Sequence, residues 1–382
     1  MIQKHSNRVL GISEALSIKY NNKVYELRDS GNDVIVLSLG EAFFDIPLLS
    51  MSELPKPAIF HYTHSRGLPE LREKIAKYYY DEYGVSCDAS REIILTAGSK
   101  IAVYMALNSV IDGGDEVLVY EPAWVSYTEQ IKLCGGIPVQ IPHYVTYGDF
   151  ESYITPRTRM IILNNPNNPC GSMMSHAEIK LIHNLAKKHG IYLLSDEAYS
   201  EFGSNTQFIS FGRDDPLKEH TIICNSISKN FGISGWRIGY LISNSHLMSQ
   251  VLKINQHLIT CAPSILEMYI AKYFSTLLEI TRPQIADLMI MRSELSSFMI
   301  EIGLTRMAGD STFYFFVSIE RSKLDSGEFC MRLLEDDLIS AVPGIGYGLS
   351  CDKYIRVSFG SEPINRVKIA LNKIKNLIDL TS

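Results

Sequence analysis

Short apolar runs that alternate with helical stretches constrain the fold of this chain more than any other feature. The runs are rich in aliphatic and β-branched residues at both odd and even positions, as in strands buried on both faces by crossover helices. Such runs lie at 91–98, 115–122, 137–142, 159–166, 191–198 and 220–227, with helical stretches at 100–111, 125–134 and about 175–189. The pattern predicts a doubly wound, mainly parallel α/β domain from about 42 to 275.

The last hundred residues have a different pattern. A long helix (about 282–302) precedes the run STFYFFVSI (311–319), and a final helix follows YIRVSFG (354–360). This order predicts a smaller α+β unit with an antiparallel or mixed sheet. The first forty residues contain an amphipathic helix and the apolar strand VIVLSLG (34–40), which the pattern assigns to neither unit.

Composition excludes several classes of protein. The 382 residues carry a net charge of −6, whereas nucleic-acid-binding proteins normally have a basic excess. No stretch approaches the roughly 20 apolar residues of a membrane span, and the opening residues contain no signal-peptide core. The seven cysteines are scattered and form no CxxC pair. We therefore expect a cytoplasmic globular enzyme with reduced thiols and no metal site.

Small residues follow the first run of the α/β pattern, at the edge where ligands gather in open α/β sheets. In TAGSK (96–100), Gly98 and Ser99 lead straight into a helix, where free backbone N–H groups can approach an anion. An ordinary tight turn is the alternative. Lys100 favours the anion, because a cation at a helix N-terminus is otherwise unfavourable.

Polar residues also follow later runs. NNPNNPCG (164–171) presents several amide donors, although a plain loop has the same composition. Asp196 ends an apolar strand, where a carboxylate needs a cation or donor, unless it caps a helix. Tyr199 lies three residues further on, on the same side of a helical turn.

Lys229 lies in the polar segment NSISKNFG (225–232), between two apolar strands. Most lysines are solvated surface cations, but these strands hold Lys229 at the level of the other strand ends. A partly desolvated lysine has a lowered pKa and is a competent amine nucleophile. Arg237, which opens the next strand, can reach a phosphate.

Two further residues have both a structural and a ligand-binding interpretation. Trp124 follows the run at 115–122 and is either a stacking surface for a flat ligand or a core aromatic. Arg356 alternates with apolar residues in KYIRVSFG, so it points either into water or towards a carboxylate in a cleft between the units.

A phosphate-bearing pyridine aldehyde would use all of these groups together. Lys229 would form a Schiff base, Asp196 would keep the ring nitrogen protonated, and Trp124 would stack on the ring.

On these motifs, together with SLGEAFFDIP (38–47), YTHSRGLPELREKIAKYY (62–79) and DGGDEVLVYEPAWVSY (112–127), the chain resembles the class I/II (fold type I) pyridoxal-phosphate aminotransferases. It is most similar to their aspartate-aminotransferase-like branch. The resemblance implies a large cofactor-binding domain (42–275) and a small domain formed by residues 1–41 and 276–382.

The resemblance also implies roles for individual residues. Lys229 is the Schiff-base lysine and proton carrier, Asp196 the partner of the ring nitrogen, and Tyr199 the donor to the ring oxygen. The phosphate site would comprise Gly98, Ser99, Ser226 and Arg237, and Tyr62 would reach the phosphate of a neighbouring subunit in a homodimer. Lys100 would contact both the cofactor and the substrate. The remaining cofactor and substrate contacts would come from Gly40, Trp124, Asn168 and Arg356, with Arg356 binding the α-carboxylate.

The substrate is the least determined feature. Lys100 falls where aspartate-preferring relatives carry a lysine, which suggests an acidic amino donor with a 2-oxo acid as acceptor. The segment before Tyr62 is shortened and GEPDFDTP is here GEAFFDIP, so the substrate entrance differs from the family pattern. Elimination, cyclisation or oxidation on the same scaffold is the alternative reaction. A cofactor-binding module without catalysis is a third reading.

Overall fold

A seven-stranded sheet forms the centre of the molecule, with strand order β2-β8-β7-β6-β5-β3-β4. The computed structural model describes residues 5–203 and 207–382. All neighbouring strands are parallel except β8, which runs antiparallel to both β2 and β7. The strands are β2 (Ile93–Thr96), β3 (Glu116–Tyr120), β4 (Ile137–Ile141), β5 (Thr158–Asn164), β6 (Tyr192–Asp196), β7 (Thr221–Ser226) and β8 (Gly239–Ile242). The predicted mainly parallel α/β architecture is therefore confirmed.

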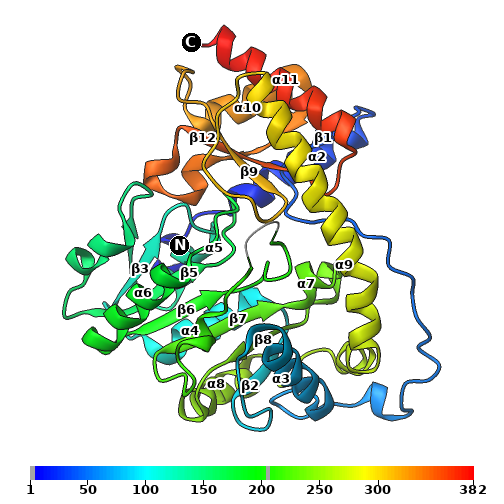
Figure 1. Ribbon diagram of the computed structural model, residues 1–382, viewed down its shortest axis with the longest axis vertical. Coiled ribbons are helices and arrows are strands. Elements are labelled where there is room, and N and C mark those ends of the chain that lie inside the picture. The colour runs from blue at the N-terminus through cyan, green and yellow to red at the C-terminus, as the bar shows by residue number, and fades with distance from the viewer. Residues whose placement is uncertain (1–4, 204–206) are drawn as a thin grey trace.

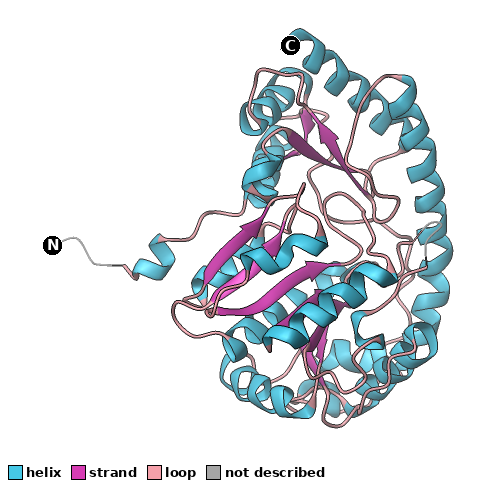
Figure 2. Ribbon diagram, turned by 60° about the vertical axis from the view of Figure 1, so that its left-hand side comes forward, coloured by secondary structure: helices cyan, strands magenta, loops and turns pink. Residues whose placement is uncertain are grey.

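Helices cover both faces of this sheet, as Figure 2 shows. Successive residues of one strand enter opposite cores: Ile222 packs with α4, α5 and α8, whereas Ile223 packs with α3 and the start of α9. This explains the apolar residues at both parities. The helices are α3 (Pro69–Tyr83), α4 (Ser99–Val110), α5 (Ser126–Leu133), α6 (His176–His189), α8 (Ser245–Leu258) and α9 (Ser264–Glu301). We call this part of the molecule the large unit.

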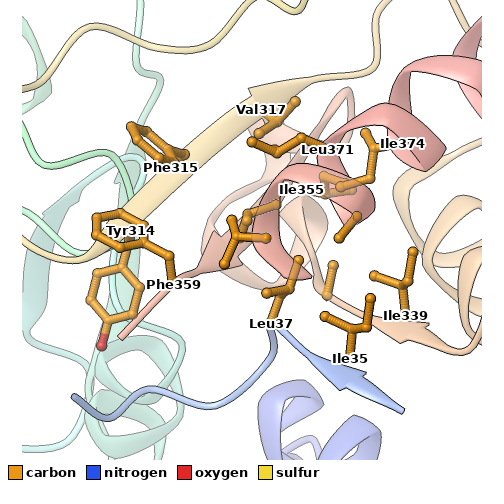
Figure 3. Close-up of a cluster of buried hydrophobic side chains, with 14 of the residues drawn as sticks. Ile35, Leu37, Tyr314, Phe315, Val317, Ile339, Ile355, Phe359, Leu371 and Ile374 are labelled. Atoms are coloured by element: carbon orange, nitrogen blue, oxygen red, sulfur yellow. The ribbon is translucent and has the colours of Figure 1, made fainter. Parts of the chain in front are cut away.

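A second, smaller unit carries the antiparallel sheet β11-β12-β9 and the parallel pair β1-β10. Its elements are α2 (Leu16–Asp29), β1 (Ile35–Val36), β9 (Tyr314–Ser318), α10 (Ser326–Asp337), β10 (Ile339–Ser340), β11 (Val342–Pro343), β12 (Tyr354–Ser358) and α11 (Ile364–Leu380). Ile35 pairs with Ile339, so the N-terminal strand β1 forms a two-stranded sheet with β10 of the C-terminal part. Figure 3 shows the shared apolar core of this small unit.

Helix α9 connects the two units. It has 38 residues and begins well before the predicted start near 282, with Pro283 inside it and a bend at Tyr273. Proline is favoured in the first turn of a helix, but Pro283 lies in the interior of α9. The N-terminal part packs Leu277 into the large unit, and the C-terminal part packs Leu295 into the small unit. Figure 1 shows α9 running alongside both units, and the predicted boundary between residues 275 and 276 falls inside it.

Although α9 exceeds the roughly 20 residues of a membrane span, neither it nor any other helix within 5–203 and 207–382 is apolar enough to cross a bilayer.

Candidate active site

A cavity of about 420 Å³ lies at the carboxyl edge of the large sheet, beneath the small unit. Parallel strands β5, β6 and β7 end at Asn164, Asp196 and Ser226, which explains why residues distant in sequence meet here. Among its lining residues are most of the predicted site residues: Gly40, Ser99, Lys100, Trp124, Asn168, Asp196, Tyr199, Ser226, Lys229, Arg237 and Arg356.

Lys229 projects from α7 (Ile227–Asn230), a single helical turn directly after β7. The turn forms because the Ser226 hydroxyl accepts a hydrogen bond from the Ser228 backbone N–H at 3.3 Å. The Lys229 amine donates to the carbonyl of Gly40. Burial lowers the pKa of this amine to about 8, an effect that nearby Glu41 partly opposes. A substantial fraction of the amine is therefore neutral and nucleophilic near neutral pH.

Asp196 ends β6 and is buried. The Tyr127 hydroxyl donates to its Oδ2 at 2.6 Å, and the Ala198 N–H donates to its Oδ1 at 3.2 Å. Burial raises the pKa of this carboxyl group, and the two hydrogen bonds oppose that rise. The result is a buried acceptor suited to a cationic or N–H partner.

A chain of hydrogen bonds joins Tyr199 to Arg356. The Tyr199 hydroxyl lies 2.9 Å from that of Tyr314 and accepts a bond from Asn168 Nδ2 at 3.3 Å. Arg356 Nη1 donates to Asn168 Oδ1, also at 3.3 Å. Asn168 therefore orients a phenol from the large unit and a guanidinium from the small unit towards the same cavity.

Arg356 is 3% exposed and lies over the ring of Tyr314, with its guanidinium carbon 4.6 Å from the ring centre. Its Nη2 donates to the Ser38 carbonyl at 2.7 Å, and its Nε has no hydrogen-bond partner. No described carboxylate lies within ion-pairing distance of this arginine. Of the two predicted directions for Arg356, the structure has the one towards the cleft, and a buried unpaired guanidinium is suited to a carboxylate.

Gly98 lies behind Arg237 rather than in the wall of the cavity. It has φ +89°, and a Cβ atom there would lie 2.2 Å from Arg237 Nη2, so only glycine leaves room for that guanidinium. Arg237 also donates to the Ser234 carbonyl at 2.7 Å. The N-terminus of α4 and the hydroxyl groups of Ser99, Ser226, Ser228 and Ser234 complete this side of the cavity. The arrangement suits a phosphate.

Trp124 and Lys100 also line the cavity. The Trp124 ring packs edge-to-face on Tyr127, with centroids 5.2 Å apart. The Lys100 amine lies 5.1 Å from the Trp124 ring centre. Burial, and then the charge of Arg237, lowers the pKa of Lys100. The cationic side chains that line the cavity outnumber the carboxylates of Glu41 and Asp196, so the cavity has an excess of positive charge.

Tyr62 lies outside this cavity and is 84% exposed. It belongs to the segment 41–66, which Figure 1 shows running along the outside of α9 from the small unit to the large unit. Within one chain it contacts none of the groups described above, and its predicted role concerns a second subunit.

Some residues of the site were not predicted from the sequence. Glu41 and Tyr314 line the cavity, and Tyr127 contacts it only through its hydrogen bond to Asp196. Tyr127 lies three residues after Trp124 in the first turn of α5, a spacing that puts two side chains on one helix face. That spacing was the available signal. Tyr314 begins an apolar strand, and nothing in its local sequence separates it from core aromatics.

The residues present fit pyridoxal phosphate. The cavity contains an amine with a lowered pKa, a buried carboxylate and an indole ring. It also contains a cluster of hydrogen-bond donors suited to a phosphate, beside Gly98, where a Cβ atom would collide with Arg237. These are the groups that a phosphorylated pyridine aldehyde requires. Lys229, Asp196 and Trp124 would hold its aldehyde, ring nitrogen and ring face.

Comparison with known proteins agrees with this chemistry. The family model "Aminotransferase class I and II" matches residues 26–374. An aspartate aminotransferase of Pyrococcus horikoshii is 31% identical over 94% of this chain and 97% of its own. The (5-formylfuran-3-yl)methyl phosphate transaminase of Methanocaldococcus jannaschii is 33% identical over 93% and 94%.

Among solved structures, aspartate aminotransferase from Thermus thermophilus with maleate superimposes with a TM-score of 0.89, at 26% identity over 98% of this chain and 100% of that chain. This neighbour has fold type I, as predicted here. The chain therefore belongs to the class I and II aminotransferases, and it is a pyridoxal-phosphate-dependent enzyme that transfers amino groups.

Proposed function

We propose that this enzyme transfers the amino group of an acidic α-amino acid to a 2-oxo acid by a ping-pong mechanism at one site. The observation that carries the proposal is the pair of cations, Arg356 and Lys100, that line the same cavity as Lys229. A dicarboxylic donor would satisfy both, with its α-carboxylate on Arg356 and its distal carboxylate on Lys100.

The remaining site residues have roles that follow from their chemistry. Pyridoxal phosphate, when bound, supplies a protonated pyridine ring that withdraws electrons from the substrate Cα. Lys229 serves as the amine that holds the aldehyde and then as the base that moves the proton at Cα, a role supported by its lowered pKa. Asp196 accepts the ring N–H, and Tyr199 and Asn168 bind the ring oxygen. Ser99, Ser226 and Arg237 bind the phosphate, and Gly98 gives Arg237 its room.

Gly40 is proposed to let the substrate approach closely. A Cβ there would lie 3.2 Å from the Tyr314 hydroxyl and 3.7 Å from Arg356 Nη1. Any side chain at this position would compete with the α-carboxylate for the guanidinium.

The test is a donor panel read by cofactor absorbance. Purified protein loaded with pyridoxal phosphate is mixed with single amino acids, and the absorbance should fall with aspartate or glutamate and return when a 2-oxo acid is added. Assay of free ammonia separates transamination from elimination, because only elimination releases it. Release of ammonia without recovery of the absorbance would refute the proposed reaction.

The acidic donor is tested separately with Lys100→Met. This variant should lose kcat/KM for aspartate by about 10- to 100-fold, the value of one charge-assisted hydrogen bond, and change little with alanine. Lys253→Met, on the exposed side of α8, is the matched control. An equal loss with both donors, or no loss with aspartate, would remove the assignment of Lys100.

We further propose a cytoplasmic homodimer in which Tyr62 of one chain reaches the phosphate site of the other. The support is the exposure of large apolar side chains, with Leu10 66%, Phe60 76% and Tyr62 84% exposed. The N-terminal helix α1 (Asn7–Leu10), at the edge of the chain in Figure 2, has no buried residue. The seven thiols are free, as suits a reducing compartment. Sedimentation of the purified protein would reveal a monomer if the proposal is wrong.

We also propose that the domains 42–275 and 1–41 with 276–382 move relative to each other when substrate closes the cavity. The contact of Arg356 with Asn168 supports this, because it joins the two domains inside the site.

A further inference from the structure

Tyr127 is a buried phenol for which the amino-transfer chemistry above has assigned no task. It is 1% exposed, and its hydroxyl donates one hydrogen bond, to Asp196 Oδ2 at 2.6 Å. Within the described chain this is the only hydrogen bond of that hydroxyl. Burial and the negative charge of Asp196 raise the pKa of the phenol well above its ordinary value, so the hydroxyl keeps its proton and remains a donor near neutral pH.

The position of Tyr127 is fixed from three directions. It lies in the first turn of α5, and its backbone N–H donates to the Trp124 carbonyl at 3.1 Å. The Trp124 ring packs edge-to-face on the Tyr127 ring at an interplanar angle of 77°. One tyrosine thus contacts both the aromatic face and the carboxylate that line this part of the cavity.

We propose that Tyr127 is a positioning residue that keeps Asp196 ionised and holds its carboxylate in a fixed orientation relative to the Trp124 ring. A carboxylate that accepts a hydrogen bond binds a proton less tightly than one that does not. A proton shared between Asp196 and a facing pyridine nitrogen therefore stays on the nitrogen. The inference rests on the proposed function for this last step alone.

The other titratable groups around Asp196 do not replace this donor. The Tyr199 phenol lies in the turn after β6 and the Cys224 thiol lies on β7, and burial raises the pKa of both, which keeps them neutral. The positive charge of Lys229 also lowers the pKa of Asp196, although less than the two hydrogen bonds do. When the Lys229 amine is neutral or bonded to an aldehyde, the hydrogen bonds from Tyr127 and the Ala198 N–H remain.

The variant Tyr127→Phe tests the proposal because it removes the hydroxyl and keeps the ring against Trp124. The first readout is the ionisation of Asp196 in the full-length protein freed of cofactor, followed by carbon-13-edited infrared absorption and assigned with Asp196→Asn. In Tyr127→Phe the carboxyl group should protonate at a pH at least about one unit higher. An unchanged titration would overturn the proposal, and this readout needs neither donor nor turnover, so it fails independently of the proposed function.

The second readout uses the protein loaded with pyridoxal phosphate. In Tyr127→Phe we expect kcat to fall by about tenfold or more with KM nearly unchanged, because ring protonation affects the chemical step rather than donor binding. The pH dependence of the cofactor absorbance should shift as well. A rise in KM alone would show that the tyrosine serves packing, against the proposal.

Two further proteins make the result specific. Tyr120→Phe removes a phenol hydroxyl that is bonded to a backbone carbonyl elsewhere in the large unit, and it should change neither readout. Incorporation of 3,5-difluorotyrosine at position 127 retains the shape of tyrosine and makes its hydroxyl a stronger donor. It should shift the titration of Asp196 to lower pH, opposite to the shift expected for phenylalanine. A shift to higher pH would contradict the proposed role, and this result can be read even if Tyr127→Phe does not fold.

Discussion

The carboxylate of Glu121 accepts hydrogen bonds from both the backbone N–H, at 2.9 Å, and the hydroxyl of Ser350. Glu121 directly follows β3 of the large unit, and Ser350 precedes β12 of the small unit. The Leu349 N–H also donates to this carboxylate, at 2.8 Å, and a Cβ on Gly348 would lie 2.2 Å from Glu121 Cδ. Glu121 therefore joins the two units three residues from Trp124.

Replacement of Glu121 by glutamine should weaken this connection. The amide retains one oxygen and cannot accept all three hydrogen bonds, so we expect a loss of roughly 2–4 kcal/mol in the free energy of unfolding. KM for the amino donor should rise, because the loop beside Trp124 is less well held. Chemical denaturation and donor kinetics measure the two effects, with Glu335→Gln on exposed α10 as control. Equal stability of E121Q and E335Q would contradict this account.

Glu267 predicts a pH-dependent stability. It is buried in the first turn of α9, where its carboxylate accepts hydrogen bonds from the Thr63 hydroxyl at 2.6 Å and the Leu68 N–H at 3.2 Å. Burial raises its pKa from 4.5 to about 7. Between these two values the folded chain binds more protons than the unfolded chain, so this group lowers stability as pH rises through that window.

The variant Glu267→Gln should therefore stabilise the protein at pH 8, by on the order of 1–3 kcal/mol, and the gain should shrink towards pH 5. Thermal unfolding at both pH values measures this, with Glu70→Gln on the exposed side of α3 as control. A gain that is the same at both pH values would have another cause.

Lys229 in the cofactor-free protein should react with an acylating reagent at unusually low pH. Its pKa is lowered to about 8 by burial, whereas exposed lysines titrate near about 10.4. The neutral amine is the reactive form, so the labelling rate at Lys229 should rise with pH and level off above about 8. Peptide mass spectrometry after short labelling pulses gives the rate for each lysine in the same sample. A rate at Lys229 that continues to climb with those of the surface lysines would be evidence against a desolvated amine.

Gly98→Ala should weaken cofactor binding without unfolding the protein. The new methyl group would displace the Arg237 guanidinium, and the loss of one charge-assisted hydrogen bond corresponds to about a 10- to 100-fold higher Kd for pyridoxal phosphate. Gly113→Ala is the matched control, because its Cβ would meet no atom within 4 Å. Fluorescence titration of the cofactor-free proteins compares them.

The strands of the large sheet were predictable because both of their faces are buried, which leaves an unbroken apolar run for each strand. The polar residues after those runs were predictable for a related reason: parallel strands end at one edge, so Asp196 and Lys229 had to lie near each other. The environment of Arg356 was not predictable. Alternation along β12 shows which face of the strand carries the side chain, but not whether that face contacts water or a cleft.

The remaining features depend on contacts between distant segments. Tyr127 has an ordinary helical sequence around it, and only the end of β6, 69 residues away, makes it part of the site. Helix α9 begins before the predicted residue 282 because burial against both units sustains the helix on either side of Pro283. The local sequence does not show that burial. The pairing of Ile35 with Ile339 likewise depends on how distant segments of the small unit pack together, which the local sequence around either residue does not show.

Helix α9 has a consequence for any attempt to separate the two units. Its Thr281 hydroxyl donates to the Asn230 carbonyl, next to Lys229, and Arg282 pairs with Glu201, two residues beyond Tyr199. A fragment that stops at residue 275 would lose these contacts with the catalytic turn together with most of the 38-residue helix. We therefore expect that neither unit folds independently. A recombinant version of either unit alone would need a redesigned end of α9 in order to fold stably.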